Sequence, residues 1–253
     1  MGEALVAGLL SAGWARAGEL VVVEPVAGRR AQLGERYPGL AVADAPQPAE
    51  GTVVAVKPGD VEAACRAAAA AGVSRVLSVA AGVRLADLEA WVGTGVPVVR
   101  AMPNTPALIG AGAAAIAGGS VASDSDLAWA EEILAAVGVV ERVTERLLDA
   151  VTGLSGSGPA YVFVVAEALI EAGVLVGLSR ATSRTLVLQT LLGSARMLVE
   201  SGQDPEQLRA TVTSPGGTTA AGLQALEARA VRRAFAEAVL AAASRSEQLG
   251  GSG

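Results

Sequence analysis

Short apolar runs alternate with helical segments over the first half of the chain, and this alternation constrains the fold more than any other feature. The apolar runs at 19–23, 52–56, 75–79, 96–100, 113–117 and 139–143 have the continuous hydrophobicity of buried parallel strands. Helical patterns occupy 4–10, 29–36, 60–71, 85–91 and 124–137. Strands that alternate with helices predict crossover units and an α/β, Rossmann-type, doubly wound parallel sheet.

The strand pattern stops after about Thr144, and the second half of the chain has only helical patterns. These lie at 147–154, 160–178, 180–200, 205–212, 219–228 and 231–249. We therefore expect two domains: residues 1–146 as a dinucleotide-binding domain and residues 147–253 as an all-α domain.

The composition excludes several classes of function. The 253 residues have a formal net charge of -6, which disfavours nucleic acid or an anionic membrane as the main partner. There is no histidine and one cysteine, Cys65, so we expect no metal site and no Ser-His or Cys-His nucleophile. The apolar stretch 161–178 contains Glu167 and Glu171, which suit an interface helix better than a membrane span. With an acidic residue at position 3 where a signal peptide is basic, we expect a cytoplasmic protein.

One glycine and one acidic residue in the first half of the chain suggest a dinucleotide-binding site. Gly2, at the start of the first helix, could be the last glycine of a G-x-G-x-x-G fingerprint whose first strand and first two glycines are not present, or it could be an ordinary residue after the initiator methionine. Glu24 ends the run 19–23, where a carboxylate typically binds the adenosine ribose and disfavours a 2'-phosphate. Arg29 and Arg30 follow closely and could instead hold such a phosphate, or the segment could be a solvated helix start.

Two loops after expected strands carry polar groups. Lys57 and Pro58 follow the run 52–56, and Lys57 is the only lysine in the chain, which favours a ligand contact over a solvated turn. The loop 100–106 presents Asn104 and Thr105 between two prolines that restrict the backbone.

The segment Val212–Gly222 (VTSPGGTTAAG) is the most specific in the second half. Its glycines allow a close approach of the backbone to a ligand, and it opens a helix whose free amides and dipole favour an anion. The alternative is a long N-cap that binds no ligand. The segment 156–161 (GSGPAY) opens the long apolar helix in a similar way and is either a ligand contact or a helix start at a dimer interface.

Four motifs together resemble pyrroline-5-carboxylate reductase, the last enzyme of proline synthesis. They are AVKP at 55–58, RAMPNTP at 100–106, GSGPAY at 156–161 and VTSPGGTT at 212–219, in this order along nearly the whole chain. The resemblance implies NAD(P)H-dependent reduction of 1-pyrroline-5-carboxylate to L-proline by a homodimer, or a ring of such dimers, built through interleaved helices.

The resemblance also implies roles for particular residues. The expected cofactor contacts are Gly2, Glu24, Ala55, Val56, Lys57, Pro58, Met102, Pro103 and Asn104. The expected substrate contacts are Ser214, Gly216, Gly217, Thr218 and Thr219. Thr219 is expected to bind the imine nitrogen, as a polariser and proton relay, since hydride chemistry belongs to the cofactor and needs no histidine.

The sequence departs from this family at two places. Family members have a strand and a glycine-rich turn before the position of Met1, so we expect unpaired backbone groups, an uncovered core face, and a natural product that begins upstream. Glu24 stands where many members have a small polar or basic residue, which predicts a preference for NADH.

Two other functions remain open from the sequence. One is a reductase of the beta-hydroxyacid type, although these usually have a lysine in the helical domain and this chain has none after Lys57. The other is a truncated, non-catalytic helical dimer that binds a metabolite.

Overall fold

The computed structural model describes residues 1–250 of the 253-residue chain, which form two compact units. The first contains Met1–Ser157 and the segment that starts at Ala241, and the second contains Gly158–Leu240. The sequence predicted a domain boundary near residue 146, whereas the two units divide between Ser157 and Gly158. The later boundary arises because α6 (Leu148–Val151) places Leu148 in the core of the first unit. The two units are described separately below.

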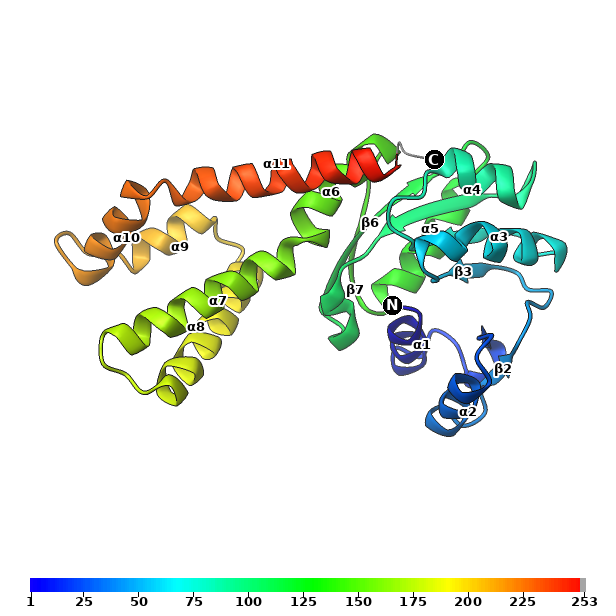
Figure 1. Cartoon of the computed structure of the whole chain (residues 1–253), viewed down its shortest axis with the longest axis horizontal. Helices are drawn as coiled ribbons and strands as arrows, with labels where there is room; N and C mark the ends of the chain where they lie inside the picture. Colours follow the sequence, from blue (N-terminus) through cyan, green and yellow to red (C-terminus); the bar gives the residue numbers. More distant parts are fainter. Residues whose placement is uncertain (251–253) are drawn as a thin grey trace. The chain divides into compact units, whose positions relative to one another are not determined.

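A five-stranded sheet organises the first unit (Figure 1). Its order is β3 (Thr52–Val54), β4 (Val76–Ser78), β5 (Val98–Met102), β6 (Gly112–Gly118) and β7 (Gly138–Arg142). All neighbours are parallel except β5 and β6, which run antiparallel. The sequence predicted a doubly wound parallel sheet, and the β5–β6 pair is its one exception among the described strands. The short connection through η3 (Thr105–Ile109) explains the difference, because a parallel return needs a crossover of roughly a dozen residues.

Helices cover both faces of this sheet and form two hydrophobic cores. On one face, α3 (Val61–Ala70) and α4 (Leu85–Val92) bury Val61, Cys65 and Leu88. On the other face, α1 (Gly2–Ser11) and α5 (Asp124–Ala135) bury Leu5, Leu9 and Ile133. The central strands are buried between these layers, as the continuous apolar runs predicted for a Rossmann-type domain.

The first strand of the chain belongs to a separate small sheet. β1 (Val21–Val23) pairs in parallel only with β2 (Ala41–Ala43), and α2 (Ala27–Arg36) connects them. Within the described residues, β3 pairs only with β4, so β1 and β3 each have one unpaired edge. The prediction that the run 19–23 is buried was wrong: Val21 and Val23, which point to the same face of this small sheet, are 45% and 42% exposed.

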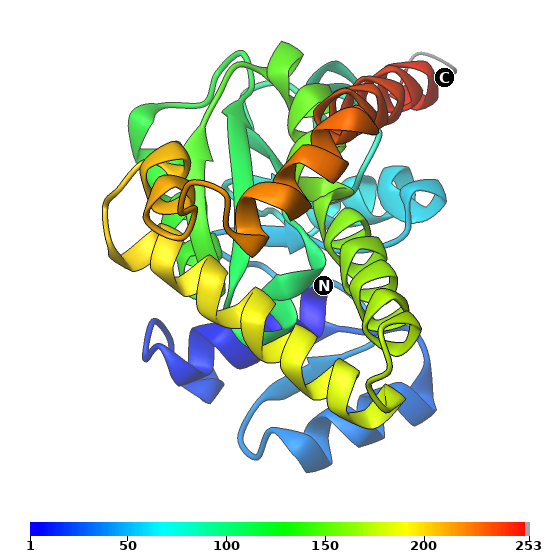
Figure 2. The same cartoon turned by 90° about the vertical axis from the view of Figure 1, so that its left-hand side faces the viewer.

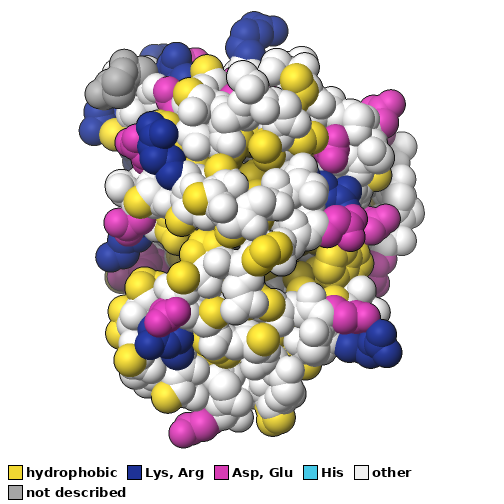
Figure 3. Space-filling model, turned by 90° about the vertical axis from the view of Figure 1, so that its right-hand side faces the viewer, with side chains coloured by type: hydrophobic (Ala, Val, Ile, Leu, Met, Phe, Trp, Pro, Cys, Tyr) yellow, Lys and Arg dark blue, Asp and Glu magenta, His cyan; other side chains and the backbone are white. Residues whose placement is uncertain are grey.

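The surface of the molecule carries mixed charges. Figure 3 shows one face, on which hydrophobic side chains occupy the middle and acidic and basic side chains alternate around the rim. No single sign of charge dominates this face, as expected for a chain with a moderate net charge of -6.

The second unit is helical (Figure 2). α7 (Gly158–Leu175) and α8 (Arg180–Glu200) pack against each other as a hairpin, followed by α9 (Pro205–Thr211) and α10 (Thr218–Ala228). Gly173 is required at the α7–α8 crossing, because an added Cβ would lie 2.1 Å from the Ser183 hydroxyl. The last helix, α11 (Val231–Gly250), begins in this unit, and its final turns belong to the first unit.

One helical run, Glu145–Leu175, is long and apolar enough to cross a membrane by length and composition, with a mean hydropathy of 1.6. Only 6% of its most apolar window is buried within the chain, and Phe163 and Val164 are exposed. A single such helix is weak support for a membrane span, because an apolar helix that associates with a second protein chain has the same composition.

Candidate cofactor and substrate site

The loops that follow β3 and β4 meet at the carboxyl edge of the sheet, where doubly wound folds bind ligands. After β3, Lys57 is the N-cap of η2 (Pro58–Asp60), and its carbonyl accepts a hydrogen bond from the Asp60 amide at 2.9 Å. Val56, Lys57 and Pro58 are all exposed at this edge. After β4, the chain turns at Gly82, which adopts a φ of 77°.

The start of α1 lies beside the end of β3. A Cβ added at Gly2 would lie 3.3 Å from the Cβ of Ala55, so these two predicted cofactor contacts are neighbours. The amino end of α1 thus reaches the ligand edge with its free amides, as a helix that binds a pyrophosphate must. The residues at this edge fit a dinucleotide.

Glu24 lies at the carboxyl end of β1, and its side chain is held locally. Its Oε1 accepts a hydrogen bond from the Val26 amide at 2.9 Å. Arg30 donates to the carbonyls of Glu24 and Pro25 at 2.9 Å and 2.8 Å, and Arg29 forms an ion pair with Glu3. Both arginines that could hold a 2'-phosphate are therefore engaged with this chain.

The loop after β5 is clamped onto the segment that ends the first unit. The buried Asn104 accepts a hydrogen bond from the Ala113 amide at 2.9 Å and donates one to the Ser155 carbonyl at 3.1 Å. Met102 packs so closely on Gly156 that an added Cβ there would lie 2.7 Å from the Met102 methyl group. Two sequence motifs, 100–106 and 156–161, are thereby brought together, and the Asn104 amide acts first as a structural clamp.

A partly buried ion pair joins β5 to the loop that follows β4. Arg100, on β5, donates from Nη1 to Glu145 Oε1 at 2.9 Å, and its side chain is only 7% exposed. The same carboxylate oxygen accepts a hydrogen bond from the Leu85 amide at 2.7 Å, at the start of α4. Glu145 therefore holds together β5 and the end of the loop that follows β4.

A π-helix, η5 (Thr152–Gly156), follows α6 and was not predicted from the sequence. Two hydrogen bonds stabilise its wider turn. The Ser157 amide donates to the Thr152 carbonyl at 2.8 Å, and the Thr152 hydroxyl donates to the Leu148 carbonyl. Short π-helical insertions occur frequently at functional sites. Its two glycines, Gly153 and Gly156, are the only trace of it in the sequence.

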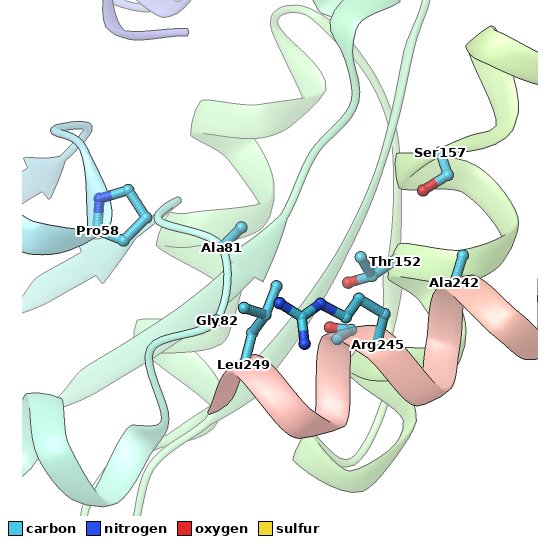
Figure 4. Close-up of a pocket in the computed structure, with 9 residues that line it drawn as sticks. Pro58, Ala81, Gly82, Thr152, Ser157, Ala242, Arg245 and Leu249 are labelled. Atoms are coloured by element: carbon cyan, nitrogen blue, oxygen red, sulfur yellow. The ribbon is translucent and has the colours of Figure 1, made fainter. Parts of the chain in front are cut away.

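A pocket of about 430 Å³ opens within the first unit (Figure 4). The loops after β3 and β4 and the π-helical region form one side, and the last turns of α11 form the other. The lining residues are Pro58, Ala81, Gly82, Thr152, Ser157, Ala242, Arg245, Ser246 and Leu249.

Sequence reasoning missed the contribution of α11 to this pocket. Ala242, Arg245 and Leu249 are spaced as one helical face, but nothing in the sequence indicates that this face returns to the sheet. The Ser246 hydroxyl fixes the return by a hydrogen bond to Asp149 Oδ1 at 2.6 Å.

The predicted substrate segment lies in the second unit, at the amino end of α10. Gly217 is the N-cap of this helix, and its amide donates to the Ser214 carbonyl at 3.0 Å. Gly216 adopts a φ of 69°, which favours glycine. An added Cβ at Gly217 would lie 2.4 Å from the Ser214 hydroxyl, so Ser214 lies over the helix start that Thr218 and Thr219 open.

The structure thus brings together the predicted contacts Gly2 and Ala55, and joins the loop of Met102, Pro103 and Asn104 to the segment 155–157. It places Ser214 and 216–219 in the other unit. Within residues 1–250 no cluster of three histidine, cysteine, aspartate or glutamate side chains could hold a metal ion. Cys65 is buried in the core, and desolvation raises the pKa of its thiol to about 11.

A Rossmann-type sheet with a pocket at the carboxyl ends of its strands, followed by a helical unit, defines a class of two-domain, dinucleotide-dependent oxidoreductases. The family model described as pyrroline-5-carboxylate reductase dimerisation matches residues 145–249. The pyrroline-5-carboxylate reductase of Mycobacterium tuberculosis is 45% identical, over 98% of this chain and 93% of that protein.

Two solved structures are also similar. That of a pyrroline-5-carboxylate reductase from Coxiella burnetii matches with a TM-score of 0.93 and 35% identity, over 98% of this chain and 94% of that one. The Plasmodium falciparum pyrroline carboxylate reductase with NADP bound matches with a TM-score of 0.85 and 32% identity, over 99% and 95%. The chain belongs to the pyrroline-5-carboxylate reductase family, as its four motifs predicted, and not to the beta-hydroxyacid type.

Proposed function

We propose that this chain reduces 1-pyrroline-5-carboxylate to L-proline with NAD(P)H, as a cytoplasmic enzyme of proline synthesis. The observation that carries the proposal is the similarity over nearly the whole chain to reductases of that name, together with a glycine-opened helix suited to a small carboxylate. The chain has no histidine, and this chemistry needs none.

The cofactor is proposed to bind at the carboxyl edge of the sheet, where it supplies the hydride that reduces the imine carbon. Gly2 and Ala55 would lie against its pyrophosphate, and Glu24 against its adenosine ribose. Val56, Lys57 and Pro58 would lie along it on one side, and Met102, Pro103 and Asn104 on the other. A relative with NADP bound supports a dinucleotide here, and the preference for NADH follows from the charge of Glu24.

The substrate is proposed to bind at the start of α10. The free amides of this helix and its dipole favour the carboxylate, with Ser214, Gly216, Gly217 and Thr218 around it. Thr219 would donate a hydrogen bond to the ring nitrogen, or accept one from its protonated form, and so orient the imine. No dedicated acid is required, because the imine nitrogen is protonated readily near neutral pH.

The active assembly is proposed to be a homodimer, or a ring of dimers, formed through the second unit. α7 exposes Val162, Phe163, Val164 and Leu169, and α8 exposes Leu186 and Leu192. Exposed apolar side chains on consecutive turns are typical of helices that are buried in a partner. The match of residues 145–249 to a dimerisation domain supports this assignment.

The test is the oxidation of NADH and of NADPH in the presence of 1-pyrroline-5-carboxylate, for the wild type and for Thr219→Ala. We expect a fall in kcat on the order of a hundredfold in the variant, the lower end of the range for lost proton-transfer assistance. Thr94→Ala, in the exposed turn between α4 and β5, is the control and should keep the wild-type rate. Equal rates for Thr219→Ala and wild type would remove Thr219 from the mechanism.

A non-catalytic, metabolite-binding dimer is the second candidate, because the sheet is divided between β1 and β3. Fluorescence titration with NADH distinguishes the two functions. An intact dimer that binds neither NADH nor NADPH would favour this candidate over the reductase.

A further inference from the structure

Arg245 is the only charged side chain among the described residues that line the pocket of the first unit. It extends from α11 into the space between the loop at Ala81 and Gly82 and the helical segment that carries Thr152 (Figure 4). Among these lining residues there is no carboxylate to neutralise it. Its guanidinium donates a 3.1 Å hydrogen bond from Nη1 to Gln248 Oε1, a neutral group on the same helix.

The position of Arg245 is fixed by its neighbours on α11. The adjacent Ser246 is buried and donates to Asp149 at 2.6 Å, which ties the helix to α6. At the end of the helix, an added Cβ on Gly250 would lie 3.4 Å from the Gly82 carbonyl oxygen and 3.5 Å from Arg84 Nε. α11 is thus held against α6 at Ser246 and lies against the loop that follows β4 at Gly250.

A guanidinium is a planar fork of N–H donors that matches the two oxygens of a carboxylate or a phosphate. The pocket that holds it lies at the carboxyl ends of β3 and β4, the edge at which ligands bind in this fold class. We propose that Arg245 is a specificity-determining residue that binds an oxyanion group of the ligands, an inference that rests on the proposed function. The two sources of such a group are a phosphate of the cofactor and the carboxylate of the substrate.

The experiment compares Arg245→Gln and Arg245→Lys with the wild type in three measurements. These are the Kd for NADPH by fluorescence titration, the KM for the proposed substrate 1-pyrroline-5-carboxylate, and kcat/KM for 1-pyrroline, which has the same ring without a carboxylate. In Arg245→Gln the charged, two-point contact is lost, and the affinity for the ligand that Arg245 binds should fall by roughly tenfold to hundredfold. The affinity of Arg245→Lys should lie between those of the wild type and Arg245→Gln, because lysine keeps the positive charge but lacks the two parallel N–H donors of the guanidinium.

The pattern of the losses identifies the group. A raised KM for 1-pyrroline-5-carboxylate, with the Kd for NADPH and the activity on 1-pyrroline unchanged, assigns Arg245 to the substrate carboxylate. A raised Kd for NADPH, with losses on both substrates, assigns it to a phosphate of the cofactor. A purely structural role would lower both activities without changing either ligand's affinity selectively, and would overturn the proposal.

The control is Arg233→Gln, on the same helix, where an exposed arginine pairs with Glu237. This variant should match the wild type in all three measurements. If Arg245→Gln melts near the wild-type temperature and leaves the Kd and both kinetic constants within twofold, the proposal is wrong. A wild type without reductase activity would overturn the proposed function instead, and the NADPH titration and a titration with L-proline would still decide the role of Arg245.

Discussion

The side-chain amide of Asn104 donates a hydrogen bond to the backbone carbonyl of Ser155 at 3.1 Å, and so joins the loop after β5 to the π-helix η5. The carbonyl of the same side chain accepts from the Ala113 amide on β6 at 2.9 Å. Asn104 is buried, and its side chain makes the hydrogen bonds that these two backbone groups would otherwise make to water. Removal of the side chain would leave both groups without that partner. One amide group therefore fixes three segments of the first unit.

We expect Asn104→Ala to destabilise the chain by about 1–2 kcal/mol, because it leaves two partly buried backbone groups without their hydrogen-bond partner. The measurement is the free energy of unfolding in urea. Asn104→Asp is the matched variant, because it keeps the acceptor for Ala113 and loses the donor to Ser155. If both variants unfold at the wild-type urea concentration, the clamp has no energetic role.

The pair of Arg100 and Glu145 makes a second prediction about stability. Glu145→Gln leaves the buried Arg100 guanidinium without a charged partner, and should cost about 2 kcal/mol, less than for a fully buried pair because Glu145 is 35% exposed. The matched control is Glu237→Gln, which breaks an exposed ion pair with Arg233 and should change the free energy of unfolding by under about 0.5 kcal/mol. Equal effects of the two substitutions would contradict the importance of burial.

Gly217→Ala tests the proposed substrate site. The added methyl group would displace the Ser214 hydroxyl, and we expect the KM for 1-pyrroline-5-carboxylate to rise roughly tenfold, while the Kd for NADPH stays the same. Gly222→Ala, later in α10, meets no atom within 4 Å in this chain and serves as the control. A KM that rises equally in both variants would point to a general disturbance of α10.

Burial raises the pKa of the Cys65 thiol to about 11, from an ordinary value of 9.0. The thiol is therefore neutral and unreactive in the folded chain at pH 8, and iodoacetamide should label it only after unfolding in urea. Since the folded pKa is the higher one, the stabilisation is complete below about pH 9 and is lost as the pH rises to about 11. Rapid labelling of the native chain, measured by mass spectrometry, would show that the site opens locally.

The unpaired edges of β1 and β3 predict that the sheets accept an added strand. A synthetic peptide of about five apolar, β-branched residues, added in excess, should raise Tm, because its backbone can pair with an unpaired edge. A Gly-Ser peptide of equal length is the control. The same Tm with both peptides would contradict this prediction.

The sequence predicted most of the elements because hydrophobic periodicity and glycine or proline boundaries report local structure. It failed where structure depends on distant parts of the chain. β2 is only Ala-Val-Ala, too short for a periodic signal, and the exposure of Val21 and Val23 depends on which strand lies beside them. The reversed direction of β6 depends on the length of one connection, not on its composition.

The candidate site shows the same division. Lys57, Asn104 and 214–219 could be selected because polar groups and glycines stand out at element ends. The sequence could not predict the structural role of Asn104, the π-helix or the position of Arg245. Each of these arises from packing between segments that are far apart in the sequence. The spacing of Ala242, Arg245 and Leu249 shows a helical face but not what the face contacts.

The return of α11 to the sheet has a consequence for the size and polarity of the pocket. Leu249 and Ala242 line it from the same helix, so substitutions on this face of α11 change the cavity without touching any strand or loop of the sheet. A change in the last turns of one helix can therefore alter which small molecules fit at the carboxyl edge of the sheet.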